Sequence, residues 1–271
     1  MNKYYILLLL LIIIILPLIC NLNYNYIENY TSAIPLNIFQ TWHSKDLSPK
    51  MLEAVNAVKE HNPEFSYHLY DDADCLDFIT TYFDKSVVDA YNSLLPGAYK
   101  ADLWRYCVLY IHGGVYLDIK YYPVNGFKFL ELTDKEYFAK DIESSGGGIY
   151  NAILITKPNN TILLNCIHKI VENVKNKFYG LSIFEPTGPL LLKQEFSEDE
   201  IKNMRLSIGE NNCPTKTCIE LDNKPILAIY NEYYSKKKTK TTYQTIMIYG
   251  WIVKYTKIIL KYTLYYNKII I

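Results

Sequence analysis

The sequence lacks an excess of charge of either sign. Lysine plus arginine and aspartate plus glutamate each total 28 over 271 residues, so the formal net charge is +0. A generic nucleic-acid-binding protein carries a basic excess, and this class is therefore disfavoured. Charged residues make up 21% and hydrophobic residues 50% of the chain, which excludes an intrinsically disordered protein. The composition predicts a folded body without a nucleic-acid partner.

Two further patterns are missing. The sequence has no internal repeat, and its five histidines show no zinc-ligand spacing with each other or with the cysteines. Cys213 and Cys218 have the spacing of a small disulfide loop in an oxidising compartment. Two unrelated thiols would give the same spacing, so both interpretations stay open at this point.

A long stretch near the N-terminus also lacks charged residues. An apolar run extends from Tyr4 to Cys20, Lys3 precedes it, and no charged residue follows until Glu28. This pattern predicts a signal anchor and transmembrane helix over residues 1–20 with a cytoplasmic N-terminus. A cleaved signal peptide is the alternative, but small residues are missing before a cleavage site. We therefore expect a single-pass type II membrane protein with a stalk at 21–33 and its body in the secretory-pathway lumen or outside the cell.

The C-terminal segment, residues 246–271, is predicted to form an amphipathic basic helix. Lys254, Lys257, Lys261 and Lys268 fall within one stripe at helical periodicity, and apolar residues cover the rest. A helix that lies on a membrane surface has this pattern. A final core helix with a solvated lysine face has it too.

Between these segments, residues 34–245 alternate between strand and helix patterns. Strands are predicted at 36–40, 66–70, 115–118 and 149–156, and helices at about 49–61, 74–83, 85–95, 97–112 and 159–179. This alternation predicts an α/β fold with a Rossmann-like, mostly parallel sheet flanked by helices. Ligands bind such sheets beyond the carboxyl ends of the strands. Asp118 ends a predicted strand, so we expect it in that crevice.

The densest chemical pattern lies between residues 96 and 123. Asp102 and Arg105 are spaced i, i+3 on one face of a predicted helix. Gly113 and Gly114 then reverse the chain into the strand that delivers Asp118. Two carboxylates and a guanidinium can thus converge, which suits sugar hydroxyls and a Mg²⁺ or Mn²⁺ ion that bridges phosphates. A purely structural helix–strand joint would show the same spacing.

These residues carry a family resemblance. The stretch ADLWRYCVLYIHGGVYLDI resembles the sugar-binding region of glycosyltransferase family 32, which includes yeast α-1,6-mannosyltransferases, and is similar to the core of the large glucosylating toxins. IPLNIFQTWHS at 34–44 and Thr187-Gly188-Pro189 extend the resemblance over about 34–195. It implies a GT-A nucleotide-sugar-binding fold. It also implies a retaining transferase that moves a hexose from a UDP- or GDP-sugar to a glycan or glycolipid acceptor at a membrane.

The resemblance also implies roles for single residues. Asp102 and Arg105 would hold sugar hydroxyls, and Asp118 would contact the ribose, the sugar and the metal. Trp42 would stack on the nucleotide base, and Gly114 would let the backbone approach the diphosphate. The full set of implied nucleotide-sugar-binding residues is Gln40, Trp42, Gly113, Gly114, Tyr116, Asn151 and Gly188.

Lys120 departs from the family pattern, in which the second Asp of the DXD motif binds the metal. A charged lysine has no lone pair for a metal. Either Lys120 neutralises the leaving diphosphate and catalysis needs no metal, or Asp118 and another carboxylate keep the metal while Lys120 turns aside, or donor use is lost. In the third case the chain would be a catalytically silent subunit or binding protein. The expected catalytic set is therefore Asp102, Arg105, Asp118 and Lys120, with a divalent metal left open.

Overall fold

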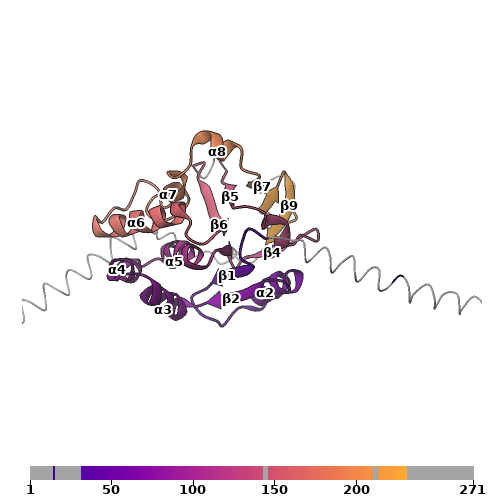
Figure 1. Ribbon diagram of the computed structural model, residues 1–271, viewed down its shortest axis with the longest axis horizontal. Helices are drawn as coiled ribbons and strands as arrows, with labels where there is room; N and C mark the ends of the chain where they lie inside the picture. Colours follow the sequence, from indigo (N-terminus) through magenta and orange to yellow (C-terminus); the bar gives the residue numbers. More distant parts are fainter. Residues whose placement is uncertain (1–14, 16–31, 143–145, 210–212, 231–271) are drawn as a thin grey trace, which may run out of the picture. The chain divides into compact units, whose positions relative to one another are not determined.

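The computed structural model describes residue 15 and residues 32–142, 146–209 and 213–230 (Figure 1). The predicted stalk and the C-terminal helix lie outside these residues, as does the predicted membrane anchor except for Ile15. Within the described residues no helix is both long and apolar enough to cross a membrane. By its internal contacts the chain divides into two units, Met1–Ala33 and Ile34–Ile271. The sheet and helices described below lie in the second unit.

One mixed sheet organises the described body. Its nine strands lie in the order β2-β1-β3-β6-β5-β7-β8-β9-β4. The strands are β1 (Asn37–Thr41), β2 (Ser66–Tyr70), β3 (Gly114–Leu117), β4 (Tyr121–Pro123), β5 (Tyr137–Lys140), β6 (Ile149–Thr156), β7 (Leu206–Gly209), β8 (Cys218–Leu221) and β9 (Lys224–Ile229).

The helices begin and end where local sequence signals place them. Pro49 starts α2 at the first helical position after Ser48, and Gly113, with a φ of 62°, ends α5. The helices are α2 (Pro49–His61), α3 (Asp72–Tyr82), α4 (Lys85–Ser93), α5 (Gly97–His112), the 3-10 helix η1 (Phe129–Leu132), α6 (Thr161–Lys175), α7 (Pro189–Lys193) and α8 (Glu198–Lys202).

Side chains that alternate along the strands pack into two separate cores. Phe39, Tyr116 and Leu154 point to one face, where α3 to α7 pack. Their chain neighbours Ile38 and Val115 point to the other face, which α2, η1 and the strands near the C-terminus cover. Figure 1 shows α3 to α6 gathered on one side of β1 and β6, with α2 beside β2. Both faces of β1, β3 and β6 are thus buried along most of their length.

The prediction of a mostly parallel sheet is wrong. Three neighbouring pairs are parallel, β1–β2, β1–β3 and β5–β7, whereas the other five are antiparallel. The parallel pairs that involve β1 come from the predicted strand–helix alternation. Three of the antiparallel pairs, β5–β6, β7–β8 and β8–β9, join consecutive strands through short connections such as the turn at Asp222 and Asn223, where a helix cannot fit. The other two, β3–β6 and β4–β9, pair strands that are far apart in the sequence.

The link between β3 and β4 shows that the sheet curls. β3 is third and β4 ninth in the strand order, yet only residues 118–120 join them. Six strand spacings in a flat sheet amount to about 29 Å, whereas four Cα steps reach at most about 15 Å. The sheet therefore bends back on itself, and Asp118-Ile119-Lys120 crosses between its two ends.

Candidate functional site

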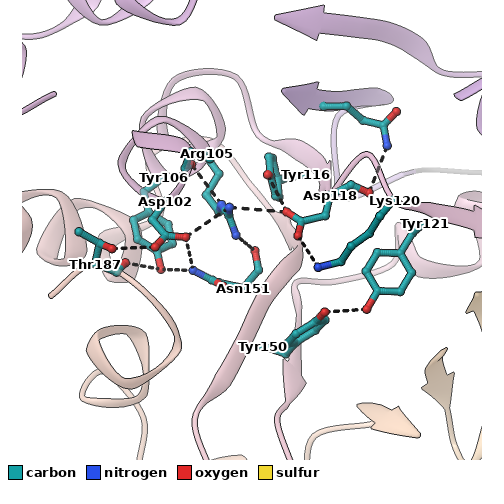
Figure 2. A network of polar contacts seen from close by, with 12 residues as sticks. Asp102, Arg105, Tyr106, Tyr116, Asp118, Lys120, Tyr121, Tyr150, Asn151 and Thr187 are labelled. Carbon is teal, nitrogen blue, oxygen red and sulfur yellow. Dashed lines mark hydrogen bonds and ion pairs between the residues drawn. The ribbon is translucent and has the colours of Figure 1, made fainter. Parts of the chain in front are cut away.

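A buried network of charged side chains lies where β3 ends against α5. Asp102 and Arg105 come from one face of α5, Asp118 follows the last residue of β3, and Asn151 comes from β6 (Figure 2). Because β6 runs antiparallel to β3, the start of β6 lies beside the end of β3. The predicted convergence of two carboxylates and a guanidinium is therefore confirmed by the geometry.

Arg105 lies at the centre of the network. Its Nη2 is 3.3 Å from Asp102 Oδ1 and 3.5 Å from Asp118 Oδ1. Its Nη1 donates to the Asn151 carbonyl oxygen at 2.6 Å, and its Nε donates to the carbonyl of Ala101 at 3.1 Å. The guanidinium also stacks 4.5 Å from the ring centroid of Tyr116. This planar fork fixes both carboxylates at once, which a lysine could not do.

Asp102 is held by neutral donors as well as by Arg105. Asn151 Nδ2 donates to Oδ1 at 2.9 Å, and Thr187 Oγ1 donates to Oδ2 at 2.7 Å. Burial raises the pKa of Asp102, and the Arg105 charge offsets this rise only in part. A Cβ at Gly188 would lie 3.3 Å from Oδ2, so the absence of a side chain there leaves room for the carboxylate.

Asp118 lies between two cations. Its Oδ2 is 3.0 Å from Lys120 Nζ, and its Oδ1 accepts a hydrogen bond from the Tyr116 hydroxyl at 2.8 Å. Burial alone would raise the pKa of Asp118, but Lys120 and then Arg105 outweigh burial and lower it. The Asp118 side chain keeps 23% of its surface exposed, so this end of the network is open to a ligand.

Gln40 and Tyr116 support Asp118 from behind. Gln40 is fully buried; its Nε2 donates to the Asp118 carbonyl at 3.4 Å, and its Oε1 accepts from the Tyr67 hydroxyl at 2.7 Å. Tyr116 is equally buried, under Arg105. Both residues were predicted to bind the nucleotide sugar. The structure places them behind the carboxylate, where both donate hydrogen bonds to Asp118, and their role in binding the nucleotide sugar stays a prediction.

Lys120 is enclosed by two tyrosines. Its Nζ lies 5.5 Å from the Tyr121 ring centroid and 5.9 Å from that of Tyr150, and the two hydroxyls are joined by a 2.7 Å hydrogen bond. Its carbonyl oxygen accepts from the backbone N–H of Tyr230, just beyond β9. The ammonium is thus held next to Asp118 by tyrosines of β4, the last strand in the sheet order, and of β6, which pairs with β3.

Comparisons with known proteins match the part of the chain that contains most of this site. Residues 48–139 match the family described as the glycosyltransferase sugar-binding region containing a DXD motif. The predicted family resemblance is confirmed. Asp102, Arg105, Asp118 and Lys120 all lie within the matched residues, whereas Asn151 and Thr187 lie beyond them.

Relatives and one solved structure extend the comparison. The chain is 29% identical to inositol phosphoceramide mannosyltransferase 3 of Schizosaccharomyces pombe, over 63% of this chain and 47% of that protein. It is 29% identical to the initiation-specific alpha-1,6-mannosyltransferase of Candida albicans, over 36% of this chain and 27% of that protein. A solved structure named PaToxG glycosyltransferase has a TM-score of 0.50 at 18% identity, over 63% of this chain and 73% of that one. The chain spans less than half the length of these two relatives, and the body has a mixed α/β glycosyltransferase-like fold.

The DXD position in this sugar-binding region does not fit a divalent metal. Both Asp118 oxygens already have partners, and Lys120 supplies a cation where the motif has its second carboxylate. Lys120 does not turn aside, so the interpretation in which Asp118 and another carboxylate hold the metal is not supported. Across the described ranges one group of three candidate ligands lies close together, Cys213, Cys218 and Glu220, and its cysteines form a disulfide. Asp118 as a metal ligand stays a prediction, whereas the disulfide interpretation of Cys213 and Cys218 is confirmed.

The glycine pair lies at the start of β3, at the opposite end of the strand from Asp118. Gly113 precedes the strand, Gly114 begins it, and Asp118 follows it. Gly114 has a φ of 110°, and a Cβ there would lie 2.7 Å from the Asn37 carbonyl oxygen. Close packing on β1 accounts for this glycine, and a Cβ at Gly113 would collide with Pro158 in the same way. The predicted approach of the Gly114 backbone to the diphosphate, and the predicted place of Gly113 among the nucleotide-sugar-binding residues, stay predictions.

Trp42 lies one residue beyond β1, half-buried in a small cluster with Met51, Val55 and Ile119. Ile119 is the middle residue of the motif. The predicted base-stacking tryptophan is therefore packed against the same three-residue link that carries Asp118 and Lys120.

Sequence reasoning missed two members of the network. Thr187 and Tyr106 are buried, and the Tyr106 hydroxyl accepts from Asn151 Nδ2 at 3.2 Å. Thr187 adjoins Gly188 in a tripeptide that already carried the resemblance, and Tyr106 follows Arg105 directly. The tripeptide was a signal for Thr187. The direction in which Tyr106 points is set by packing, which the sequence alone does not reveal.

Proposed function

We propose that this chain is a retaining glycosyltransferase of the GT-A type that moves a hexose from a UDP- or GDP-sugar to a glycolipid acceptor. The match to the sugar-binding region supports the reaction class. The names of the two relatives favour mannose as the hexose. The first relative's name also favours an inositol phosphoceramide as the acceptor. The chain spans only part of those proteins, so each of these points is part of the proposal.

One observation carries the proposal: Asp102, Arg105 and Asp118 form a buried charged network that opens to solvent at Asp118. Buried charges are costly and need specific partners, so such networks cluster at functional sites. Here the network lies beyond the carboxyl end of a strand that pairs in parallel with its neighbour β1, where ligands of α/β sheets bind. Its carboxylates can accept from sugar hydroxyls, and its guanidinium can donate to them.

The reaction that we propose breaks the bond between the anomeric carbon and the diphosphate oxygen. A bond from the acceptor hydroxyl oxygen to the same face of that carbon forms, and the departing diphosphate takes the hydroxyl proton. Negative charge therefore grows on the diphosphate. Arg105 and Lys120 are fixed cations at the open end of the network, and preorganised charge of this kind stabilises a leaving group.

The proposal includes a body in the lumen of the secretory pathway or outside the cell. The disulfide between Cys213 and Cys218 supports this, because disulfides persist in oxidising compartments. A membrane next to the site would also suit a lipid acceptor. The anchor at residues 1–20 and the helix at 246–271 stay predictions.

The test uses the full chain purified in detergent. It is incubated with a panel of UDP- and GDP-sugars, with and without inositol phosphoceramide in mixed micelles, and released nucleoside diphosphate is measured. We expect turnover of one donor, an increase on addition of acceptor, and a product with the anomeric configuration of the donor by NMR. A folded protein that turns over no donor would overturn the proposal, and donor binding without turnover would favour the silent binding protein.

A further inference from the structure

Lys120 is the residue at which this site departs most from its family, and its surroundings are built for a cation. Its side chain is only 10% exposed, and its ammonium contacts Asp118 Oδ2 at 3.0 Å. The electron-rich faces of Tyr121 and Tyr150 flank it. A buried lysine is costly unless its environment stabilises the charge, so these contacts hold a fixed positive charge at the motif.

Charge balance suggests what that positive charge replaces. A DXD motif has a carboxylate at this position and gains two positive charges when a divalent metal binds. Replacing that aspartate with lysine also adds two positive charges. The pair Asp118 and Lys120 therefore has the net charge of a metal-loaded DXD motif, and it has that charge without a metal.

We propose that the Lys120 ammonium is the resident counter-ion for the diphosphate of the donor, in place of the divalent metal of DXD enzymes. Nucleoside diphosphate then binds to this chain, and leaves it, without a metal. The inference rests on the proposed function, because it concerns the same donor site. A metal does not fit the motif of this chain, and the inference explains this misfit by a specific property of the chain.

The position of Lys120 suits this role. Asp118 keeps 23% of its side chain exposed next to the ammonium, so the ion pair lies at the open end of the network. Ile119 packs with Trp42, which is expected to stack on the base. The base platform and the ammonium thus flank one residue, as a nucleoside diphosphate with its base at one end and its phosphates at the other would require.

The first experiment needs no variant. Binding of GDP and of UDP to the full chain in detergent is measured by calorimetry in EDTA and again in Mn²⁺. We expect one nucleotide to bind with dissociation constants within about twofold in the two solutions, because an ammonium supplies the charge-assisted contacts. Binding that appears only with Mn²⁺ would overturn this inference and leave the proposed function standing. If neither nucleotide binds in either solution, the proposed function fails as well.

Variants then assign the effect to Lys120. Lys120→Met is expected to weaken nucleotide binding in EDTA by about 10- to 100-fold, the effect of removing a charged hydrogen-bond donor. Lys128→Met is the matched control: Lys128 also pairs with a carboxylate, Glu64 at 3.3 Å, but its side chain is 49% exposed. We expect it to bind nucleotide as the wild type does. Equal binding by Lys120→Met and the wild type would contradict the inference.

Lys120→Asp restores the family motif. We expect this variant to lose nucleotide binding in EDTA, to regain it in Mn²⁺, and to broaden the Mn²⁺ electron paramagnetic resonance spectrum, whereas the wild type leaves that spectrum unchanged. Thermal unfolding shows whether the variants fold. If either variant does not fold, the comparison of EDTA with Mn²⁺ in the wild type decides. A wild-type chain that broadens the Mn²⁺ signal on binding nucleotide would overturn the inference.

Discussion

The two ends of the buried network hold similar carboxylates in different ways. Among the described residues, Asp102 contacts one cation, Arg105, and the neutral donors Asn151 and Thr187. Asp118 has both Arg105 and Lys120. Burial opposes ionisation at both ends, yet the pKa of Asp102 is raised and the pKa of Asp118 is lowered. Lys120, the second cation at Asp118, decides whether the pKa is raised or lowered.

This difference separates the two carboxylates by role. Asp118 is held ionised at the end that is open to a ligand, beside the fixed ammonium. Asp102 is enclosed, and its hydrogen bonds to Thr187 and Asn151 set its orientation. Arg105 joins the two ends, so substitutions there should disturb both, whereas substitutions at either carboxylate should disturb one.

The largest effect is expected for Arg105→Lys. Lysine keeps the charge but loses the fork that contacts Asp102, Asp118 and the Asn151 carbonyl together. We expect turnover to fall by about 100-fold or more, comparable to losing one preorganised donor from an active site. Donor turnover measures this. Arg205→Lys is the matched control, because Arg205 pairs with Asp222 at the surface, and its turnover should match that of the wild type. A similar loss in both variants would contradict the central role of Arg105.

Opposite pH dependences are expected for Asp118→Asn and Asp102→Asn. The lowered pKa of Asp118 gives stability that is present above the ordinary value of 3.8 and is lost as the pH falls further. The raised pKa of Asp102 costs stability above its folded value, and this cost disappears as the pH falls towards 3.8. Urea unfolding between about pH 3 and pH 7 measures both, a range that brackets the unperturbed pKa of aspartate.

The wild-type advantage over Asp118→Asn should therefore shrink at acidic pH, whereas the advantage over Asp102→Asn should grow. Parallel trends in the two variants would show that Lys120 does not distinguish the two carboxylates.

The smallest effect is expected for Thr187→Val. The substitution keeps the shape of the side chain but removes the hydroxyl that donates to Asp102 Oδ2 at 2.7 Å. We expect a loss of about 1–3 kcal/mol in the free energy of unfolding, the cost of leaving a buried acceptor without this partner. Thr156→Val is the control, because the buried Thr156 hydroxyl has no hydrogen-bond partner in the described part of the chain. Its stability should be unchanged or slightly higher, and equal losses at both positions would argue against the hydrogen bond.

The first half of the fold could be predicted from the sequence because its signals are local. Ser48-Pro49, Gly113 and the alternation around Val115 place α2, α5 and β3 within a few residues of their observed bounds. The strands from β7 to β9 were missed although Asp222 and Asn223, both with positive φ, are typical hairpin-turn residues. That omission led to the wrong expectation of a mostly parallel sheet.

The parts of the site that depend on sequence spacing alone were predicted. The i, i+3 spacing of Asp102 and Arg105 and the strand end at Asp118 were sufficient to bring the three together. The orientation of Lys120 could not be predicted, because Tyr150 and Tyr230 fix it from distant strands. The packing of the glycine pair against Asn37 and Pro158 could not be predicted either, because these residues are adjacent to the pair only in the folded protein.

The short link between β3 and β4 also has a consequence for the order in which the chain is made. Tyr121 pairs with Ile229, so β4 cannot join the sheet until β9 has been synthesised. At ribosomal rates of about 5–20 residues per second, that delay is on the order of ten seconds. During this time Asp102 and Arg105 can already meet on α5, but Lys120 lacks the strand that fixes its backbone. The nascent chain would thus assemble the enclosed pair of charges on α5 first and the ammonium last.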